Sequence, residues 1–264
     1  MRKRGFTLIE LLVVISIIAI LMAVLMPSLQ RVREQARFMS CRSNLRNYAV
    51  VQRMYADDNN GNFPRSFDWL FKNGGTNCNW HDASRNLDQH PELAGACWSY
   101  LKSYPKIHVC PTFNNVAKSR SCSRCRGNPI PVVPQYGYTM NSYLNGDAFG
   151  SVPAQYQISI SGQNMRKESQ VKRPADTFYF GEENSWPIAG LNAAGINDTN
   201  LRPLPTRNTD SFATFHKARS SDMDHGVSNA SFVDGHVQEV NAWANDGLET
   251  WLLCWPGDRP APIW

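Results

Sequence analysis

The sequence lacks several features that would indicate catalysis or nucleic-acid binding. No nucleophile, glycine-rich phosphate loop or paired carboxylate accompanies the one histidine–aspartate group, at residues 225–236, and internal repeats and low-complexity tracts are absent. Net charge is small too. Three of the 27 basic side chains lie in residues 1–5, which leaves 24 basic against 22 acidic side chains. We therefore expect a protein that is not an enzyme, needs no cofactor and does not bind nucleic acid.

Charged residues are scarcest in the stretch that follows the first five residues. Three basic residues precede a run from Phe6 to Met26 in which Glu10 is the only ionisable group. As a helix this run would be roughly 31 Å long, which matches the roughly 30 Å hydrocarbon core of a bilayer. A secretory signal peptide would be shorter and would end in a small-x-small cleavage site, which does not follow here. A plain membrane anchor gives no purpose to Glu10, whose burial costs about 2.5 kcal/mol or more.

Residues 5–10 (GFTLIE), followed by LLVV and preceded by the basic leader, resemble the class III signal of type IV prepilins and type II secretion pseudopilins. The resemblance implies that a prepilin peptidase cleaves after Gly5 and methylates the new amino-terminal Phe6. Glu10 would then pair with the α-amino group of Phe6 on a neighbouring subunit and set the axial register of a filament. Pairing would offset the cost of burying the carboxylate.

This resemblance implies a structural subunit, or a minor component, of a type IV pilus or type II secretion pseudopilus. Its partners would be the peptidase, other pilin or pseudopilin subunits, and the membrane. We expect a single-pass protein of the bacterial inner membrane, with a cytoplasmic leader and a periplasmic or extracellular carboxy-terminal domain. An alternative is a membrane-anchored exported binding protein that uses a prepilin-type signal. The eight Trp and nine Tyr residues suggest polysaccharide as its ligand.

The chain divides into an anchor, a connecting helix and one exported domain. Beyond Pro27, which should kink or loosen the helix, an apolar stripe recurs at helical spacing over Leu29, Val32, Ala36 and Met39 and continues at Leu45, Ala49 and Gln52. We predict a pilin-like α+β fold in which a long amino-terminal helix packs on an antiparallel sheet with loop-rich insertions. The expected segments are the leader 1–5, the membrane helix 6–26, the amphipathic helix 27–57 and the globular domain 58–264.

A series of short motifs resembles, in the same order, those of prepilin-like proteins with an H-X9-DG domain. The motifs are Cys41 with residues 44–46 (NLR), residues 55–56 (YA), 60–61 (NG), 63–64 (FP), 110–111 (CP), 136–138 (YGY) and 225–237. Here eight residues, rather than nine, separate His225 from Asp234-Gly235. Asp-Gly between two apolar runs predicts a β-hairpin with a two-residue type I′ turn. His225-Gly226 would begin the partner strand, and the His225 side chain would cap the hairpin or pack near it. Metal binding or acid–base chemistry by His225, Asp234 and His236 is the alternative. We favour a structural turn, and expect the other histidines to be surface or core residues: His81, His90, His108 and His216.

The seven cysteines allow both disulfides and zinc. Apart from Cys41 on the expected helix, six remain, and they allow fifteen pairings in an oxidising compartment. We favour a disulfide from Cys110 to Cys122 or Cys125 and expect no metal. The weaker alternative is a zinc site formed by Cys122 and Cys125, which have C-x2-C spacing, together with Cys110.

Overall fold

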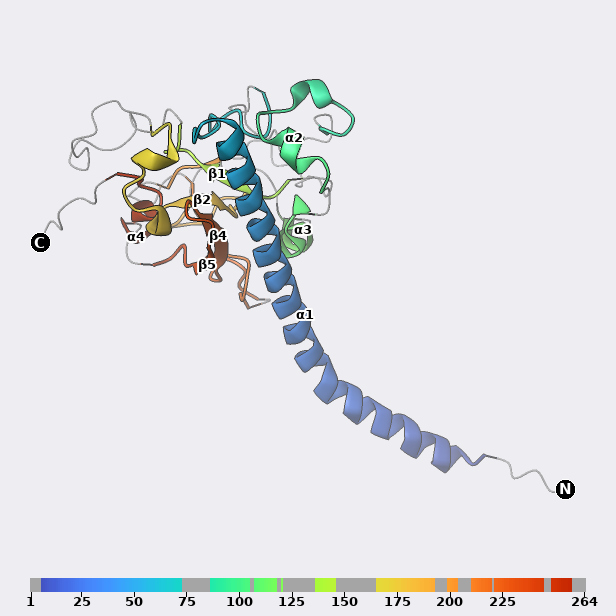
Figure 1. The fold of residues 1–264 in the computed structure, drawn as a ribbon. Helices are drawn as coiled ribbons and strands as arrows, with labels where there is room; N and C mark the ends of the chain where they lie inside the picture. The colour runs from blue at the N-terminus through green and yellow to red at the C-terminus, as the bar shows by residue number, and fades with distance from the viewer. Residues whose placement is uncertain are drawn as a thin grey trace, which may run out of the picture.

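A computed structural model shows a long amino-terminal helix, α1 (Leu8–Asp58), that projects from an α+β body (Figure 1). The structure describes residues 6–72, 86–104, 107–117, 120, 136–145, 165–192, 199–203, 210–219, 221–244 and 248–257. The α+β class is therefore confirmed. The other elements are the 3-10 helices η3 (Pro91–Leu93), η8 (Glu168–Gln170) and η9 (Pro174–Asp176), the helices α2 (Trp98–Leu101), α3 (Pro111–Ala117) and α4 (Leu248–Leu252), and the strands β1 (Thr139–Asn141), β2 (Phe178–Gly181), β3 (Asn200–Leu201), β4 (Ser228–Phe232) and β5 (Val237–Val240).

Helix α1 continues through Pro27 without a break and curves as it leaves the body (Figure 1). It ends at Asp58, and residues 59–61 (Asn-Asn-Gly) form a polar turn directly after it. Asn60 and Gly61 both adopt positive φ angles, +55° and +73°, and the Gly61 N–H donates to the Ala56 carbonyl at 2.8 Å. Such a left-handed cap satisfies carbonyl groups that the helix leaves free at its end.

The five strands form one sheet in the order β3-β1-β2-β4-β5. Three of the four strand pairs are antiparallel, but β1 and β3 run parallel. The expectation of an antiparallel sheet is therefore wrong at that edge, and the sheet is mixed. The long connection between β1 and β3, which includes β2, brings the chain back to the opposite side of β1 in the parallel direction.

The carboxy-terminal part of α1 packs across β2, β4 and β5 and against the short helices α2 and α3 (Figure 1). The apolar stripe is buried from Leu45 onward, whereas Leu29, Val32 and Met39 are exposed. The physical reason is that the body covers the helix only from Phe38. The buried α1 side chains are Phe38, Cys41, Leu45, Tyr48, Ala49, Val51, Gln52 and Ala56.

Aromatic side chains fill the contact between α1 and the sheet. The Tyr48 ring contacts the rings of Tyr138 and Phe180 at centroid distances of 5.0 and 5.2 Å. In the described part of the chain, five tryptophans are buried in this core and in the parts of the body that adjoin it, and Trp243 is partly buried. These aromatics therefore contribute to the core, where each buries a large apolar area and packs edge-to-face with its neighbours. The five buried tryptophans are Trp69, Trp98, Trp186, Trp251 and Trp255.

Candidate functional site

The first candidate site is the amino-terminal half of α1. Its apolar side chains are exposed, and the most hydrophobic 18-residue window has a mean hydropathy of 3.1 and none of it is buried. The helix is long and apolar enough to cross a membrane. Because exposing so much contiguous apolar surface to water is unfavourable, this half of the helix needs a bilayer or other protein surfaces around it.

Glu10 lies in the first turn of this helix and forms a capping box with Thr7. Its Oε2 accepts hydrogen bonds from the Thr7 N–H at 2.9 Å and from the Thr7 hydroxyl at 2.8 Å. The Glu10 N–H donates in return to the Thr7 hydroxyl oxygen at 3.3 Å. A carboxylate at this position also opposes the positive end of the helix dipole. Glu10 is thus held at the helix start, beside Phe6, while Gly5 lies outside the described residues.

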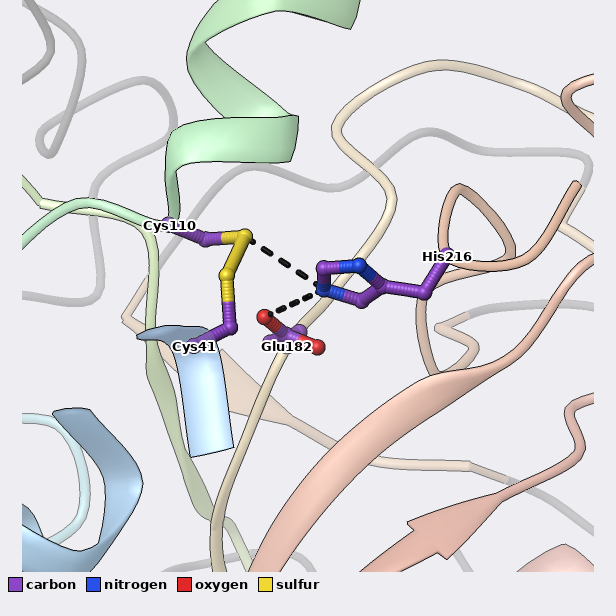
Figure 2. Close-up of side chains that lie close together, drawn as sticks. All are labelled: Cys41, Cys110, Glu182 and His216. Carbon is purple, nitrogen blue, oxygen red and sulfur yellow. Dashed lines mark hydrogen bonds and ion pairs between the residues drawn. A yellow bond between two sulfur atoms is a disulfide. The ribbon is translucent and has the colours of Figure 1, made fainter. Parts of the chain in front are cut away.

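The second candidate site is a buried polar cluster, formed by Cys41, Cys110, Glu182 and His216, between α1 and the sheet (Figure 2). Cys41 of α1 forms a disulfide with Cys110, which directly precedes α3, and their Cα atoms are 5.2 Å apart. The His216 Nε2 lies 3.0 Å from Glu182 Oε1 and 3.4 Å from Cys110 Sγ. All four residues are buried. A disulfide thus stands against a buried histidine–carboxylate pair.

Further contacts hold the two charged side chains in place. The backbone N–H of Asn229 donates to Glu182 Oε2 at 2.8 Å. On the other side of the imidazole, Glu34 Oε1 lies 3.6 Å from His216 Nδ1 and accepts a hydrogen bond from the Thr112 hydroxyl at 3.0 Å. Each ring nitrogen of His216 therefore faces a carboxylate, which favours the doubly protonated, charged imidazolium.

The protonation of His216 follows from these contacts. Burial alone lowers its pKa, but the charge and hydrogen bond of Glu182, together with Glu34, outweigh burial and raise the pKa to about 9. His216 and Glu182 therefore form a buried ion pair at neutral pH. Such a pair contributes little net stability compared with apolar residues, but removing one partner leaves a buried charge without compensation.

Gly226 of the His225-Gly226 pair places His216 in this cluster. A Cβ atom at Gly226 would lie 2.2 Å from the carbonyl oxygens of both Thr214 and His216, so only glycine allows this approach of the two backbones. Beside it, Val227 exchanges two backbone hydrogen bonds with His216, of 2.8 and 3.1 Å. This part of the resemblance to the H-X9-DG family therefore has a structural role that bears directly on the cluster.

The predicted hairpin at Asp234-Gly235 is confirmed by the pairing of β4 with β5, but the predicted turn type is wrong. Gly235 has a φ of +92°, whereas Asp234 is not among the residues with positive φ, so this is not a type I′ turn. Instead, the Gly235 N–H donates to the Phe232 carbonyl and the Phe232 N–H donates to the His236 carbonyl, each at 2.9 Å. The Asp234 carboxylate accepts from the His236 N–H at 3.1 Å, which stabilises the turn.

Two side chains of α1 bind the backbone of this hairpin. The Gln52 side-chain amide donates to the Val233 carbonyl at 2.7 Å, and the Arg42 guanidinium donates to the Val237 carbonyl at 2.9 Å. The hairpin is thus bound to α1 on both sides of its turn. This contact gives the Asp234-Gly235 motif a structural role.

His225 lies just before β4, at the end of the hairpin away from the Asp234-Gly235 turn. It precedes β4, whereas Asp234-Gly235 follows that strand, so the whole strand separates them. The exposed His225 ring stacks on Trp243 at 4.9 Å and its Nδ1 pairs with the Asp222 carboxylate at 2.8 Å. A five-residue strand is about 17 Å long, so His225 and Asp234 cannot share a metal ion or a proton-transfer step.

The predicted disulfide pairing is also wrong. Cys110 pairs with Cys41, the residue set aside because of its position on the helix. Cys122 and Cys125 lie outside the described residues, so the zinc alternative based on them stays untested. Among the other described cysteines, Cys97 and Cys254 are free thiols and buried.

Sequence reasoning did not identify the buried cluster, because its members come from distant positions. His216 was expected to be a surface or core residue and is in fact an ion-paired core residue. Of the other histidines, His108 is buried against the Tyr48 hydroxyl at 3.2 Å, His90 is exposed, and His81 lies outside the described residues. The one usable signal was the Glu182-Glu183 pair directly after the apolar strand 177–180.

Comparison with known proteins identifies a motif at the amino terminus of the chain. Residues 1–26 match the family described as the prokaryotic N-terminal methylation motif. Over 57 residues the chain is 51% identical to the type IV wide pilus major component PilA4 of Thermus thermophilus; this covers 22% of the chain and 44% of that relative. No solved structure matches the chain. The family match is thus confined to residues 1–26, and these lead into a helix that is long and apolar enough to cross a membrane.

Proposed function

We propose that the protein is a structural subunit, or a minor component, of a type IV pilus or type II secretion pseudopilus. The observation that carries this proposal is the exposed apolar half of α1, which begins with a prepilin motif and projects from a folded body (Figure 1). Before assembly a bilayer would cover the apolar surface, and in a filament the helices of neighbouring subunits would do so. The similarity to a type IV pilus component supports the same function.

In this proposal the leader is removed after Gly5 by a prepilin peptidase, and Phe6 becomes a methylated amino terminus. Cleavage would create a positive charge on Phe6, two residues before α1 begins at Leu8, and the capping box holds Glu10 in the first turn of that helix. A carboxylate in an apolar filament core would be strongly destabilising unless a charge of opposite sign lies beside it. The α-amino group of Phe6 in the next subunit would supply that charge and set the axial spacing.

The proposal also gives location and partners. The leader would face the cytoplasm, α1 would cross the bacterial inner membrane once, and the body would be periplasmic or extracellular. The peptidase and other pilin or pseudopilin subunits would be its partners. The chain would act by assembly rather than by catalysis.

Two substitutions at Glu10 test this mechanism. Glu10→Ala removes both the charge and the cap, whereas Glu10→Gln keeps a capping-box side chain and removes only the charge. We expect both variants to lose filament assembly, measured by co-purification with tagged subunits. An uncompensated charge costs about 3–5 kcal/mol, which corresponds to a more than 100-fold weaker association. Wild-type assembly of Glu10→Gln would show that capping, not charge, is the role of Glu10, and wild-type assembly of both variants would contradict the proposal.

The processing step has its own test. Mass spectrometry of the protein from its native membrane should give a chain that begins with methylated Phe6. Gly5→Val would block cleavage and leave the leader in place, and serves as the control. An amino terminus elsewhere in the wild-type chain would contradict the prepilin interpretation.

The alternative function is polysaccharide binding by exposed aromatic residues. In the described part of the chain the tryptophans are buried or partly buried, so they offer no flat exposed platform on which a sugar ring could stack. The assembly proposal is therefore favoured.

A further inference from the structure

The buried cluster of Cys41, Cys110, Glu182 and His216 contains the donor atoms of a zinc site. Two sulfur atoms, an imidazole nitrogen and a carboxylate oxygen all lie within 4.8 Å of one another. They come from four separate segments of the chain, and the side chains point toward a common centre (Figure 2). Two cysteines, one histidine and one carboxylate are ligand types that zinc accepts in a four-coordinate site.

The distances fit a tetrahedral arrangement on three of these residues. Zinc bonds of about 2.0 Å to nitrogen and oxygen and about 2.3 Å to sulfur give ligand–ligand distances of roughly 3.3–3.8 Å. The His216 Nε2 lies 3.4 Å from Cys110 Sγ and 3.0 Å from Glu182 Oε1, so both contacts already approach those values. The two sulfur atoms, which are bonded to each other, must separate, and the remaining donor pairs lie within 4.8 Å of one another.

The surroundings also match those of a metal centre. A metal-bound histidine usually directs its second ring nitrogen toward a carboxylate, and Glu34 Oε1 lies 3.6 Å from His216 Nδ1. A metal-bound carboxylate is usually held by a hydrogen bond of its own, and Asn229 N–H donates to Glu182 Oε2 at 2.8 Å. These outer contacts would fix the orientation of two ligands before a metal arrives.

We propose that reduction of the Cys41–Cys110 disulfide converts this cluster into a site for a single zinc ion, bound by Cys41, Cys110, Glu182 and His216. A dithiol would supply two electrons and two protons, cleave the sulfur–sulfur bond to give two thiols, and itself become a disulfide. Zinc binding then releases the two thiol protons and the Nε2 proton of His216 to solvent. The oxidised chain holds the covalent bond, and the reduced chain holds the metal in the same place.

Metal binding by the full chain in detergent tests this proposal. The protein is purified with a phosphine reductant, because a dithiol would itself bind zinc, and free thiols are counted by alkylation to verify reduction. Zinc is then measured by native mass spectrometry, and Co²⁺ serves as a spectroscopic probe. We expect a single metal ion per reduced chain, with a thiolate-to-cobalt absorption band, and no such band in the oxidised chain. A reduced chain without the band would overturn the proposal.

Variants separate this site from the cysteines that lie outside the described residues. Replacing Cys122 and Cys125 with Ser should leave cobalt and zinc binding unchanged. Glu182→Gln and His216→Gln, which conserve side-chain volume, should weaken zinc binding by at least about tenfold, a loss typical of disturbed metal sites. Circular dichroism of each variant verifies folding. Binding that depends on Cys122 and Cys125 but not on His216 would overturn the proposal.

A third measurement does not depend on whether the substituted chains fold. The reduced wild-type chain should unfold at a higher temperature with zinc than without it, because a metal that binds only the folded state stabilises that state. Mg²⁺ at the same concentration should have no such effect, since it prefers oxygen ligands. An equal effect of the two metals would contradict a thiolate site.

Discussion

The two halves of α1 are both helical, but they differ in exposure and in the contacts that they make with the rest of the protein. The amino-terminal half has exposed apolar side chains and one carboxylate, that of Glu10, which accepts hydrogen bonds from the N-cap residue Thr7. The carboxy-terminal half is covered by the sheet and is joined to the body by a disulfide and by side-chain hydrogen bonds to the β4–β5 hairpin. One continuous helix thus combines a segment that needs external partners with a segment that already has internal ones. Substitutions in the first half should alter assembly, and those in the second should alter folding.

The strongest test of this difference is the removal of one partner from the buried ion pair. Glu182→Gln leaves a charged His216 without its nearest carboxylate and should destabilise the body by about 3–5 kcal/mol. Urea unfolding of the full chain in detergent at pH 6, followed by tryptophan fluorescence, measures the loss.

The matched control is Asp222→Asn, which breaks the exposed pair with His225 and should cost less than about 1 kcal/mol. Equal losses for the two variants would mean that burial of the Glu182–His216 pair does not determine its importance.

Removal of the Cys41–Cys110 disulfide should give the second-largest loss of stability. Cys41→Ser opens a loop with a sequence separation of 69 residues, for which loop entropy predicts a loss of about 4 kcal/mol. Unfolding of this variant and of the wild type under reducing conditions should give similar midpoints. A wild-type midpoint that does not respond to reduction would show that the disulfide contributes nothing to stability.

Two leucines on the same helix test the comparison directly. Leu45 is fully buried, and Leu45→Ala should cost about 2–5 kcal/mol through lost apolar contact and the cavity left behind. Leu25 is 61% exposed, and Leu25→Ala should change the unfolding free energy of the body by less than about 0.5 kcal/mol. Similar losses at both positions would mean that the amino-terminal half is part of the folded core.

The pH dependence of stability gives the smallest effect. The pKa of His216 is raised to about 9 in the folded protein from its ordinary value of 6.5. Its contribution is therefore fully present below pH 6.5 and is lost as the pH rises toward 9. This difference corresponds to about 3 kcal/mol at most, reduced by any rearrangement of the pair. His216→Gln should remove this slope from the unfolding free energy between pH 6.5 and 9, and an unchanged slope would assign it to another group.

Local patterns predicted the parts of the fold that depend on neighbouring residues. The apolar run from Phe6 to Met26, the polar stop near Asp58 and the Asp234-Gly235 hairpin all follow from local chemistry. The turn type was missed because the backbone angles of Asp234 depend on how the whole hairpin docks on α1. The covered face of α1 was missed before Phe38 because helical periodicity shows which side is apolar, not where another element begins to cover it.

Contacts between distant segments account for most of what could not be predicted. Cys41 and Cys110 are 69 residues apart, and His216 lies 34 residues from Glu182. Their proximity depends on where α1 crosses the sheet and on the close backbone approach at Gly226. Neither the crossing of α1 over the sheet nor this backbone approach can be inferred from the spacing of cysteine or histidine residues. His216, which has no metal-like spacing to other histidines, therefore could not be assigned to the buried cluster.

The Cys41–Cys110 bond also determines how a pulling force would pass through the molecule. A load applied to the amino-terminal half of α1 and resisted at the sheet would travel from Cys41 directly to Cys110. The 69-residue stretch between them would lie outside the load path. Roughly 230 Å of chain contour would thus be protected from extension. Reduction of the disulfide would return this stretch to the load path.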